Sequence, residues 1–247
     1  IGSVFEGRAT KSKDFPIFTS DCVFTDDTVM TTAVANSILR DGDYVKSFKH
    51  FGRKYPGAGY GGSFFDWIHS AKIEPYFSFG NGSAMRVSPI GFAFNSIEEI
   101  LREAKKSADV THNHPEGVKG AQAVALAIFL ARQNQSKAQI KREISERFGY
   151  DLNRTLEQIR PGYYFDVTCQ GSVPESIIAF LESENYEDAV RKAVSLGGDA
   201  DTMACIAGGI AQAFYKSIPL EFVEETRSRL PADLLSVMDE FNQRYGL

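Results

Sequence analysis

The sequence contains few cysteines, no long hydrophobic run and no block of charge of one sign. Its three cysteines, Cys22, Cys169 and Cys205, are widely spaced and odd in number, which argues against a disulfide framework and against a Cys-x-x-Cys metal site. Unpaired thiols are typical of a reducing compartment, so we expect a cytoplasmic protein. No apolar stretch approaches the length of a membrane span and no signal peptide is visible, so no membrane contact is expected.

Charge and length narrow the function classes further. Lys and Arg total 27, Asp and Glu total 32, and the net charge is -5 with the two signs interspersed. The chain lacks a basic stripe that could neutralise a nucleic-acid backbone, so a nucleic-acid partner is not expected, although a small phosphate ligand needs only a local site. With 247 residues and 43% hydrophobic composition, the chain can bury one sizeable core. We expect a single domain over residues 1–247, and a monomer.

Helical periodicity dominates the chain, and strand-like alternation is scarce. Met30, Val34 and Ile38 recur every four positions, and Ser96 to Glu99 forms a capping-box pattern. Pro115 suits the first position of a helix, and the alanine-rich stretch 121–131 behind it predicts a buried central helix. Further helices are expected at 64–71, 140–148, 187–196, 203–215 and 231–245, with Pro174 marking another start. These patterns predict an all-α fold.

Two acidic segments, each followed by an apolar helical stretch, are the most unusual feature of the sequence. Asp199-Ala200-Asp201-Thr202 follows two glycines, and Thr25-Asp26-Asp27-Thr28 lies far upstream. Such residues commonly cap helix N-termini, and for each segment alone a cap is the more ordinary explanation. Several carboxylates near a core would, however, repel one another and lose solvation. Bound Mg²⁺, which favours carboxylate and hydroxyl oxygens, would relieve that cost.

Three other segments carry weaker signals. His112 and His114 flank an asparagine with no third histidine or cysteine nearby, so imidazoles hydrogen-bonded at a helix start are favoured over a zinc pair, with a substrate contact in between. The turn Gly80-Asn81-Gly82-Ser83 could present backbone N–H groups to a phosphate, although such turns are common. Glu6 by itself is ordinary, because most lone glutamates are solvated.

Taken in order, these segments resemble the ADP-ribosylglycohydrolase family over nearly the whole chain. The most specific elements are Phe24-Thr25-Asp26-Asp27-Thr28 and Gly198-Asp199-Ala200-Asp201-Thr202, with support from residues 80–86 and from Thr111-His112. The resemblance implies an orthogonal helical bundle with two Mg²⁺ ions that bind the distal ribose of ADP-ribose. The family usually has a Gly-Asp pair just before the segment that matches Gly2-Ser3, and this sequence starts after it.

The resemblance also assigns roles to individual residues. It implies metal ligands at Thr25, Asp26, Asp27, Asp199, Asp201 and Thr202. It implies substrate contacts from the loop that holds the pyrophosphate and the nearby ribose, and from a histidine: Ser78, Phe79, Gly80, Asn81, Gly82 and His112. Glu6 matches a glutamate that some members place over the scissile bond, and catalytic roles are implied for Glu6, Asp26 and Asp199.

The reaction that the resemblance implies is Mg²⁺-dependent hydrolysis of the α-glycosidic bond between the distal ribose and an acceptor. The partner is then an ADP-ribosylated protein or a small-molecule ADP-ribose conjugate. Arginine, serine, O-acetyl and nucleobase linkages remain open: the segment 2–6 leans towards O-linked substrates, whereas many bacterial-type members act on arginine. Two alternatives are a non-catalytic ADP-ribose binder, against which the retained acidic residues argue, and a metal-dependent phosphohydrolase acting on the pyrophosphate.

Overall fold

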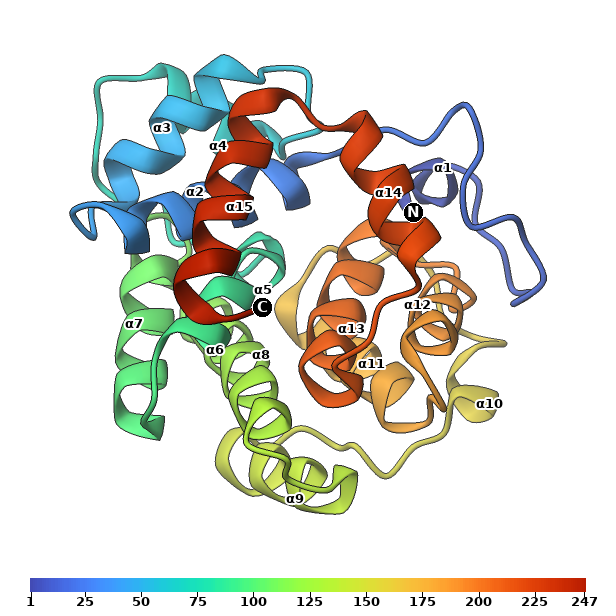
Figure 1. Cartoon of the computed structure of the whole chain (residues 1–247). Coiled ribbons are helices and arrows are strands. Elements are labelled where there is room, and N and C mark those ends of the chain that lie inside the picture. Colours follow the sequence, from blue (N-terminus) through green and yellow to red (C-terminus); the bar gives the residue numbers. More distant parts are fainter.

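The computed structural model describes residues 1–247 and consists of helices joined by loops, with one isolated β-bridge between Gly80 and Thr168. Figure 1 shows helices that run in several directions across one another, which confirms the predicted all-α, orthogonal arrangement. In chain order the helices are α1 (Ser3–Glu6), α2 (Asp26–Leu39), α3 (Tyr44–Lys54), α4 (Gly62–His69), α5 (Gly82–Met85), α6 (Ser88–Ala93), α7 (Ile97–Asp109), α8 (Pro115–Arg132), α9 (Lys137–Phe148), α10 (Leu156–Ile159), α11 (Cys169–Leu181), α12 (Tyr186–Val194), α13 (Ala200–Tyr215), α14 (Leu220–Arg229) and α15 (Ala232–Tyr245).

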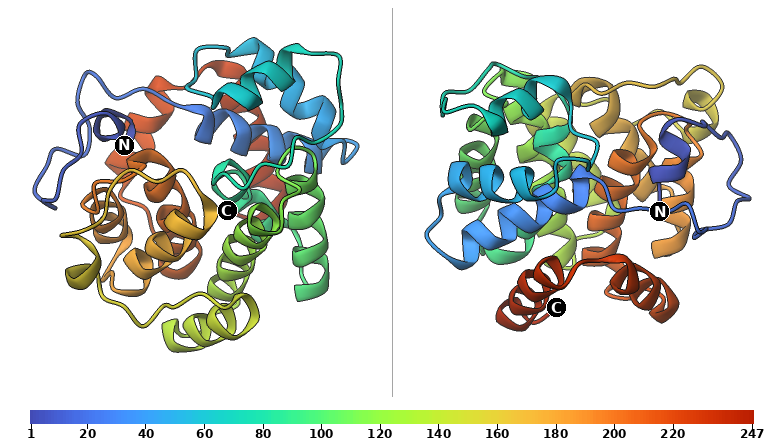
Figure 2. Two further views of the ribbon diagram at one scale, coloured as in Figure 1. Left: turned by 180° about the vertical axis from the view of Figure 1, so that it is seen from behind. Right: turned by 90° about the horizontal axis from the view of Figure 1, so that it is seen from above.

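Helix α8 is the buried central helix that the alanine-rich stretch predicts. Pro115 occupies its first turn, and the side chain of the N-cap residue His114 accepts a hydrogen bond from the Glu116 amide. Helices α5, α6, α7, α11 and α13 all pack against it (Figure 2). Small side chains permit this close approach: a Cβ atom on Gly120 would lie 2.5 Å from the sulfur of Cys169 on α11.

Helices α2 and α13 carry the two acidic segments at their N-termini, and the fold brings these ends together. Helix α2 begins at Asp26, and α13 begins directly after Asp199. The short helix α1 packs against the start of α13, where a Cβ atom on Gly2 would lie 2.4 Å from the carbonyl oxygen of Ala200. Three segments that are far apart in the sequence therefore meet at one place.

A second, smaller apolar cluster holds the N-terminal segment in position. It joins side chains from the loop after α1 to α12, α13 and α14, and consists of Phe15, Ile17, Val190, Val194, Ala200, Ala204 and Phe222. The Nζ of Lys11 also donates to the backbone oxygens of Tyr163 and Leu196, at 2.5 Å each. This anchoring fixes α1, and with it Glu6, beside α13.

One expected helix start is wrong. Pro174 lies inside α11, which begins five residues earlier at Cys169. The hydroxyl of Thr168 caps this earlier start by accepting a hydrogen bond from the Gly171 amide, so the cap and not the proline sets the boundary.

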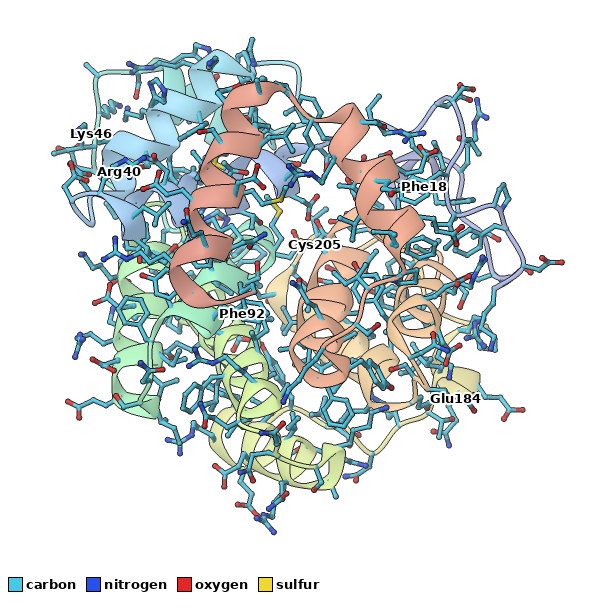
Figure 3. All side chains as sticks on the ribbon, in the orientation of Figure 1. Phe18, Arg40, Lys46, Phe92, Glu184 and Cys205 are labelled. Atoms are coloured by element: carbon cyan, nitrogen blue, oxygen red, sulfur yellow. The ribbon has the colours of Figure 1, made fainter.

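The three cysteines are free thiols: Cys22 is buried in the loop before α2, Cys169 is buried at the start of α11, and Cys205 is half-buried on α13. Figure 3 shows Cys205 on α13, where its sulfur donates to the backbone oxygen of Met85. None of the helices is long and apolar enough to cross a lipid bilayer.

Candidate metal and substrate site

A cavity of about 330 Å³ lies where α1, α2, α5 and α13 converge. Carboxylates on three of these elements line it: Glu6, Asp26, Asp199 and Asp201. The glycine-rich loop and one histidine also line it, through Ser78, Gly80, Asn81, Gly82 and His112. Most of the residues that the sequence singles out therefore face one cavity.

The carboxylates in the cavity crowd one another. Carboxylate oxygens of Glu6, Asp199 and Asp201 all lie within 4.8 Å of one another. Burial, and then the negative charge of Asp201, raise the pKa of Asp199 and of Asp26 to about 8. Burial and Asp201 also raise the pKa of Glu6. The protein thus holds acidic groups in a place that disfavours their charge, as is common at functional sites.

Asp27, Thr25 and Thr202 lie around this cluster. Asp27 is buried, and one of its oxygens, Oδ2, accepts a hydrogen bond of 2.9 Å from the Thr25 hydroxyl. Its other oxygen, Oδ1, is buried without any hydrogen-bond partner. Burial is the main cause that raises the pKa of Asp27 well above its usual value, and the hydrogen bond from the Thr25 hydroxyl partly opposes the shift. Thr202 lines the cavity, whereas Thr25 and Asp27 do not.

Capping by the N-cap residues does not account for the acidic segments. Thr25 and Asp199 occupy the N-cap positions of α2 and α13, yet neither side chain bonds to an amide of its helix. The Thr25 hydroxyl turns to Asp27, and the Asp199 carboxylate accepts a hydrogen bond of 2.8 Å from the side chain of Asn81. A cluster of carboxylate and hydroxyl oxygens that includes an unpartnered buried oxygen fits a hard divalent cation such as Mg²⁺.

The glycine-rich loop is held rigidly against the segment that precedes α11. The amide of Asn81 donates to the Val167 oxygen at 2.7 Å, and the amide of Cys169 donates to the Phe79 oxygen at 2.9 Å. The Asn81 side chain connects this loop to the acidic cluster, because its Nδ2 donates to both Asp199 and the Ser172 hydroxyl. Phe79 is exposed and does not line the cavity; its ring packs near that of His114.

The two histidines occupy different positions and do not form a pair. His114 caps α8 with its Nδ1, which agrees with the hydrogen-bonded interpretation. His112 is buried, lines the cavity and has its Nδ1 2.7 Å from the Thr111 hydroxyl. Burial, and then the charge of Arg86, lower the pKa of His112 well below its usual value. Cβ atoms on Gly80 and Gly82 would lie 3.5 and 3.2 Å from its Nε2, so these glycines allow the imidazole to approach the loop.

Several residues of the cavity were not identified from the sequence as site residues. They come from the loop before α4 and its first turn, and from positions beside the glycine-rich loop and α11: Gly59, Gly61, Gly62, Ser63, Phe64, Tyr76, Arg86 and Val167. In the sequence, the glycine-rich stretch at 57–62 is the feature that could have identified the first of these groups. It borders the acidic cluster because the Asp26 amide donates to the Ala58 oxygen at 2.7 Å.

Comparisons with known proteins agree with this geometry. The family model described as ADP-ribosylglycohydrolase matches residues 3–246. The chain is 29% identical over 256 residues to ADP-ribosylhydrolase ARH3 of Gallus gallus, covering 78% of this chain and 70% of the relative. It is 31% identical over 159 residues to ADP-ribosylarginine hydrolase Tri1 of Pseudomonas putida (strain GB-1), covering 59% of this chain and 42% of that relative.

A solved structure named as an ADP-ribosylglycohydrolase-related protein complex superimposes with a TM-score of 0.66 and 25% identity, over 81% of this chain and 75% of its own. The family match spans nearly all of the chain, from α1 to the end of α15. This protein therefore belongs to the ADP-ribosylglycohydrolase family of hydrolases.

Proposed function

We propose that this protein hydrolyses the glycosidic bond between the distal ribose of an ADP-ribose conjugate and its acceptor, in a reaction that depends on Mg²⁺. The observation that carries the proposal is the hydrogen bond from the Asn81 side chain to Asp199, which joins the glycine-rich loop to the acidic cluster within one cavity. An ADP-ribose conjugate could use both features: oxygen ligands that hold a cation near the sugar, and a close backbone approach for the phosphates.

The residues that would hold Mg²⁺ are the oxygen-bearing groups of the two acidic segments, and two ions are expected. They are Thr25, Asp26, Asp27, Asp199, Asp201 and Thr202. When bound, Mg²⁺ supplies positive charge that offsets the crowded carboxylates and polarises oxygen atoms of the ligand and of water. The unpartnered oxygen of Asp27 and the raised pKa values of Asp26 and Asp199 support this assignment.

Glu6 is the proposed group for proton transfer. It sits within 4.8 Å of oxygens from Asp199 and Asp201, and its raised pKa brings it closer to the range in which a carboxyl both holds and releases a proton. Asp26 and Asp199 position the reacting groups in this proposal. Asp199 is buried and Asp26 is half-buried, so water is kept from one side of the cluster, and once a bound cation favours their charged forms these groups act strongly on what binds there.

In this proposal the loop residues bind the phosphate part of the ligand, except Asn81, which orients Asp199. Gly80 and Gly82 bring backbone close to the cavity, and Ser78 and His112 offer polar side chains. Both hydrogens of the Asn81 amide have protein acceptors, and its backbone N–H donates to Val167. Asn81 therefore acts by orienting Asp199 and not by donating to the ligand. Phe79, exposed at the edge of the loop, offers a ring to a part of the ligand outside the cavity.

Product analysis tests the proposal. The protein is incubated with ADP-ribosylated substrates carrying arginine, serine or O-acetyl linkages, with Mg²⁺ or with a chelator, and the products are separated. We expect intact ADP-ribose, released only with Mg²⁺, and loss of release in Asp199→Ala and Asp201→Ala but not in Asp66→Asn on the exposed face of α4. Release of AMP would show phosphohydrolysis instead, binding without turnover would show a non-catalytic binder, and full activity in either Ala variant would refute the metal site.

A further inference from the structure

Arg86 is a buried positive charge without a carboxylate partner. Only 1% of its surface is exposed, and it is among the residues that line the cavity. Its guanidinium donates to the Ser107 backbone oxygen at 2.8 Å and to the Thr111 hydroxyl at 3.2 Å, and stacks 4.2 Å from the ring centre of Phe48. Its Nε has no hydrogen-bond partner. Burying an unpaired charge costs free energy, so we expect Arg86 to have a functional role that offsets this cost.

The contact with Arg86 fixes the direction of the Thr111 hydroxyl. A guanidinium can only donate hydrogen bonds, so the Thr111 oxygen accepts from Arg86. The hydroxyl hydrogen then needs an acceptor, because Thr111 is fully buried. The Nδ1 of His112, at 2.7 Å, is that acceptor. Tyr76 is also a neighbour of Thr111, but the side-chain acceptor that lies within hydrogen-bond distance of the Thr111 hydroxyl is the Nδ1 of His112.

The direction of this bond sets the protonation of His112. If Nδ1 accepts from Thr111, Nδ1 carries no hydrogen, and the single hydrogen of the neutral ring lies on Nε2. The charge of Arg86 acts in the same sense, since it favours a lone pair on the side of the ring that faces it and disfavours the imidazolium. The lowered pKa of His112 agrees with a neutral ring.

We propose that Arg86 and Thr111 are positioning residues that hold His112 in the Nε2–H form, so that His112 presents a hydrogen-bond donor to an anionic oxygen in the cavity. The Nε2 atom faces Gly80 and Gly82, and no protein group pairs with it. An Nε2–H donor on His112, with the positive charge of Arg86 buried nearby, is suited to bind an oxygen of a diphosphate. The identity of that anion as the diphosphate of ADP-ribose rests on the proposed function; the tautomer does not.

Nitrogen NMR on the protein with ¹⁵N-labelled histidine tests the hydrogen-bond relay from Arg86 through Thr111 to His112 without reference to activity. The signals of His112 are assigned by their loss in His112→Gln. One-bond coupling identifies which ring nitrogen carries hydrogen: we expect Nε2 in the wild type and in Thr111→Ser, which keeps the hydroxyl. Thr111→Val, which keeps the shape and removes the hydroxyl, should populate the Nδ1–H form or exchange between the two. Tyr76→Phe should behave as the wild type.

A hydrogen on Nδ1, or on both nitrogens, in the wild type would overturn the proposal. An unchanged tautomer in Thr111→Val would overturn the role of Thr111. Arg86→Lys keeps the charge but loses the planar fork, and is expected to give an intermediate effect.

Binding of ADP-ribose in the presence of Mg²⁺, measured by calorimetry, gives the second readout. Losing one oriented hydrogen bond should weaken binding about three- to tenfold in Thr111→Val, with recovery in Thr111→Ser. Equal affinity in Thr111→Val and wild type would contradict the role in ligand binding. If the wild type has the Nε2–H form but does not bind ADP-ribose, the relay stands and the proposed function fails, so the two outcomes are separable.

Discussion

Replacing Asp199 by Asn should stabilise the cation-free protein and weaken its stabilisation by Mg²⁺. Asp199 is buried, and its oxygen lies within 4.8 Å of an oxygen of Asp201. The substitution removes one negative charge but keeps an oxygen that can accept the hydrogen bond from Asn81. The perturbation is therefore electrostatic, with little change in shape or in hydrogen bonding.

The distance sets the magnitude. Two unit charges at most 4.8 Å apart repel by about 3 kcal/mol or more at an effective dielectric constant of ~20. Because burial and Asp201 raise the pKa of Asp199 to about 8, a retained proton relieves part of this repulsion at neutral pH. We expect a gain of about 1–3 kcal/mol in the free energy of unfolding, which corresponds to roughly 2–12 °C in Tm for a chain of this size.

Thermal unfolding in a chelator and in Mg²⁺ measures both effects. In the wild type, Mg²⁺ at about 100 times its Kd should add about 2.7 kcal/mol and raise Tm; in Asp199→Asn this increase should be much smaller. Asp66→Asn, at an exposed position on α4, is the control and should behave as the wild type in both conditions. A lower Tm for Asp199→Asn in chelator, or an undiminished Mg²⁺ response, would refute the view that these carboxylates form a cation site.

Two further changes address the catalytic proposal and the packing. Glu6→Gln should reduce kcat by about 10²–10⁴ while the Kd for ADP-ribose in Mg²⁺ changes little, because only proton transfer is lost; a normal kcat would remove Glu6 from the mechanism. Gly120→Ala should destabilise the protein by about 1–3 kcal/mol in urea unfolding, because its Cβ would lie 2.5 Å from the Cys169 sulfur. Gly209→Ala, with no atom nearer than 3.5 Å, should be neutral or stabilising by comparison, and equal behaviour of the two variants would show that the α8–α11 contact is not tight.

Local signals account for what the sequence predicts correctly. The apolar period of α2, the serine cap of α7 and the proline at the start of α8 act within a few residues, so each helix can be recognised by itself. Pro174 shows the limit of such signals: a proline is common at helix starts, but the Thr168 cap starts α11 earlier and leaves Pro174 inside it.

The composition of the acidic segments likewise points to oxygen ligands but leaves capping open. That choice depends on side-chain direction, which the sequence does not contain. In the structure the Thr25 and Asp199 side chains turn away from their helix ends, towards Asp27 and Asn81. Capping is a local interaction, whereas the observed bond to Asn81 crosses between elements and exists only in the folded chain.

The sequence by itself determined the helical class and the residue types of the site, because periodicity, capping and motif composition are local properties of the chain. Tertiary structure alone decided that Glu6 joins Asp199 and Asp201, that Asn81 orients an aspartate, and that Arg86 is buried behind His112. These relations depend on how α1, α2, α5 and α13 pack around one cavity. Charges and donors from distant segments interact strongly there because packing brings them within a few ångströms and excludes water.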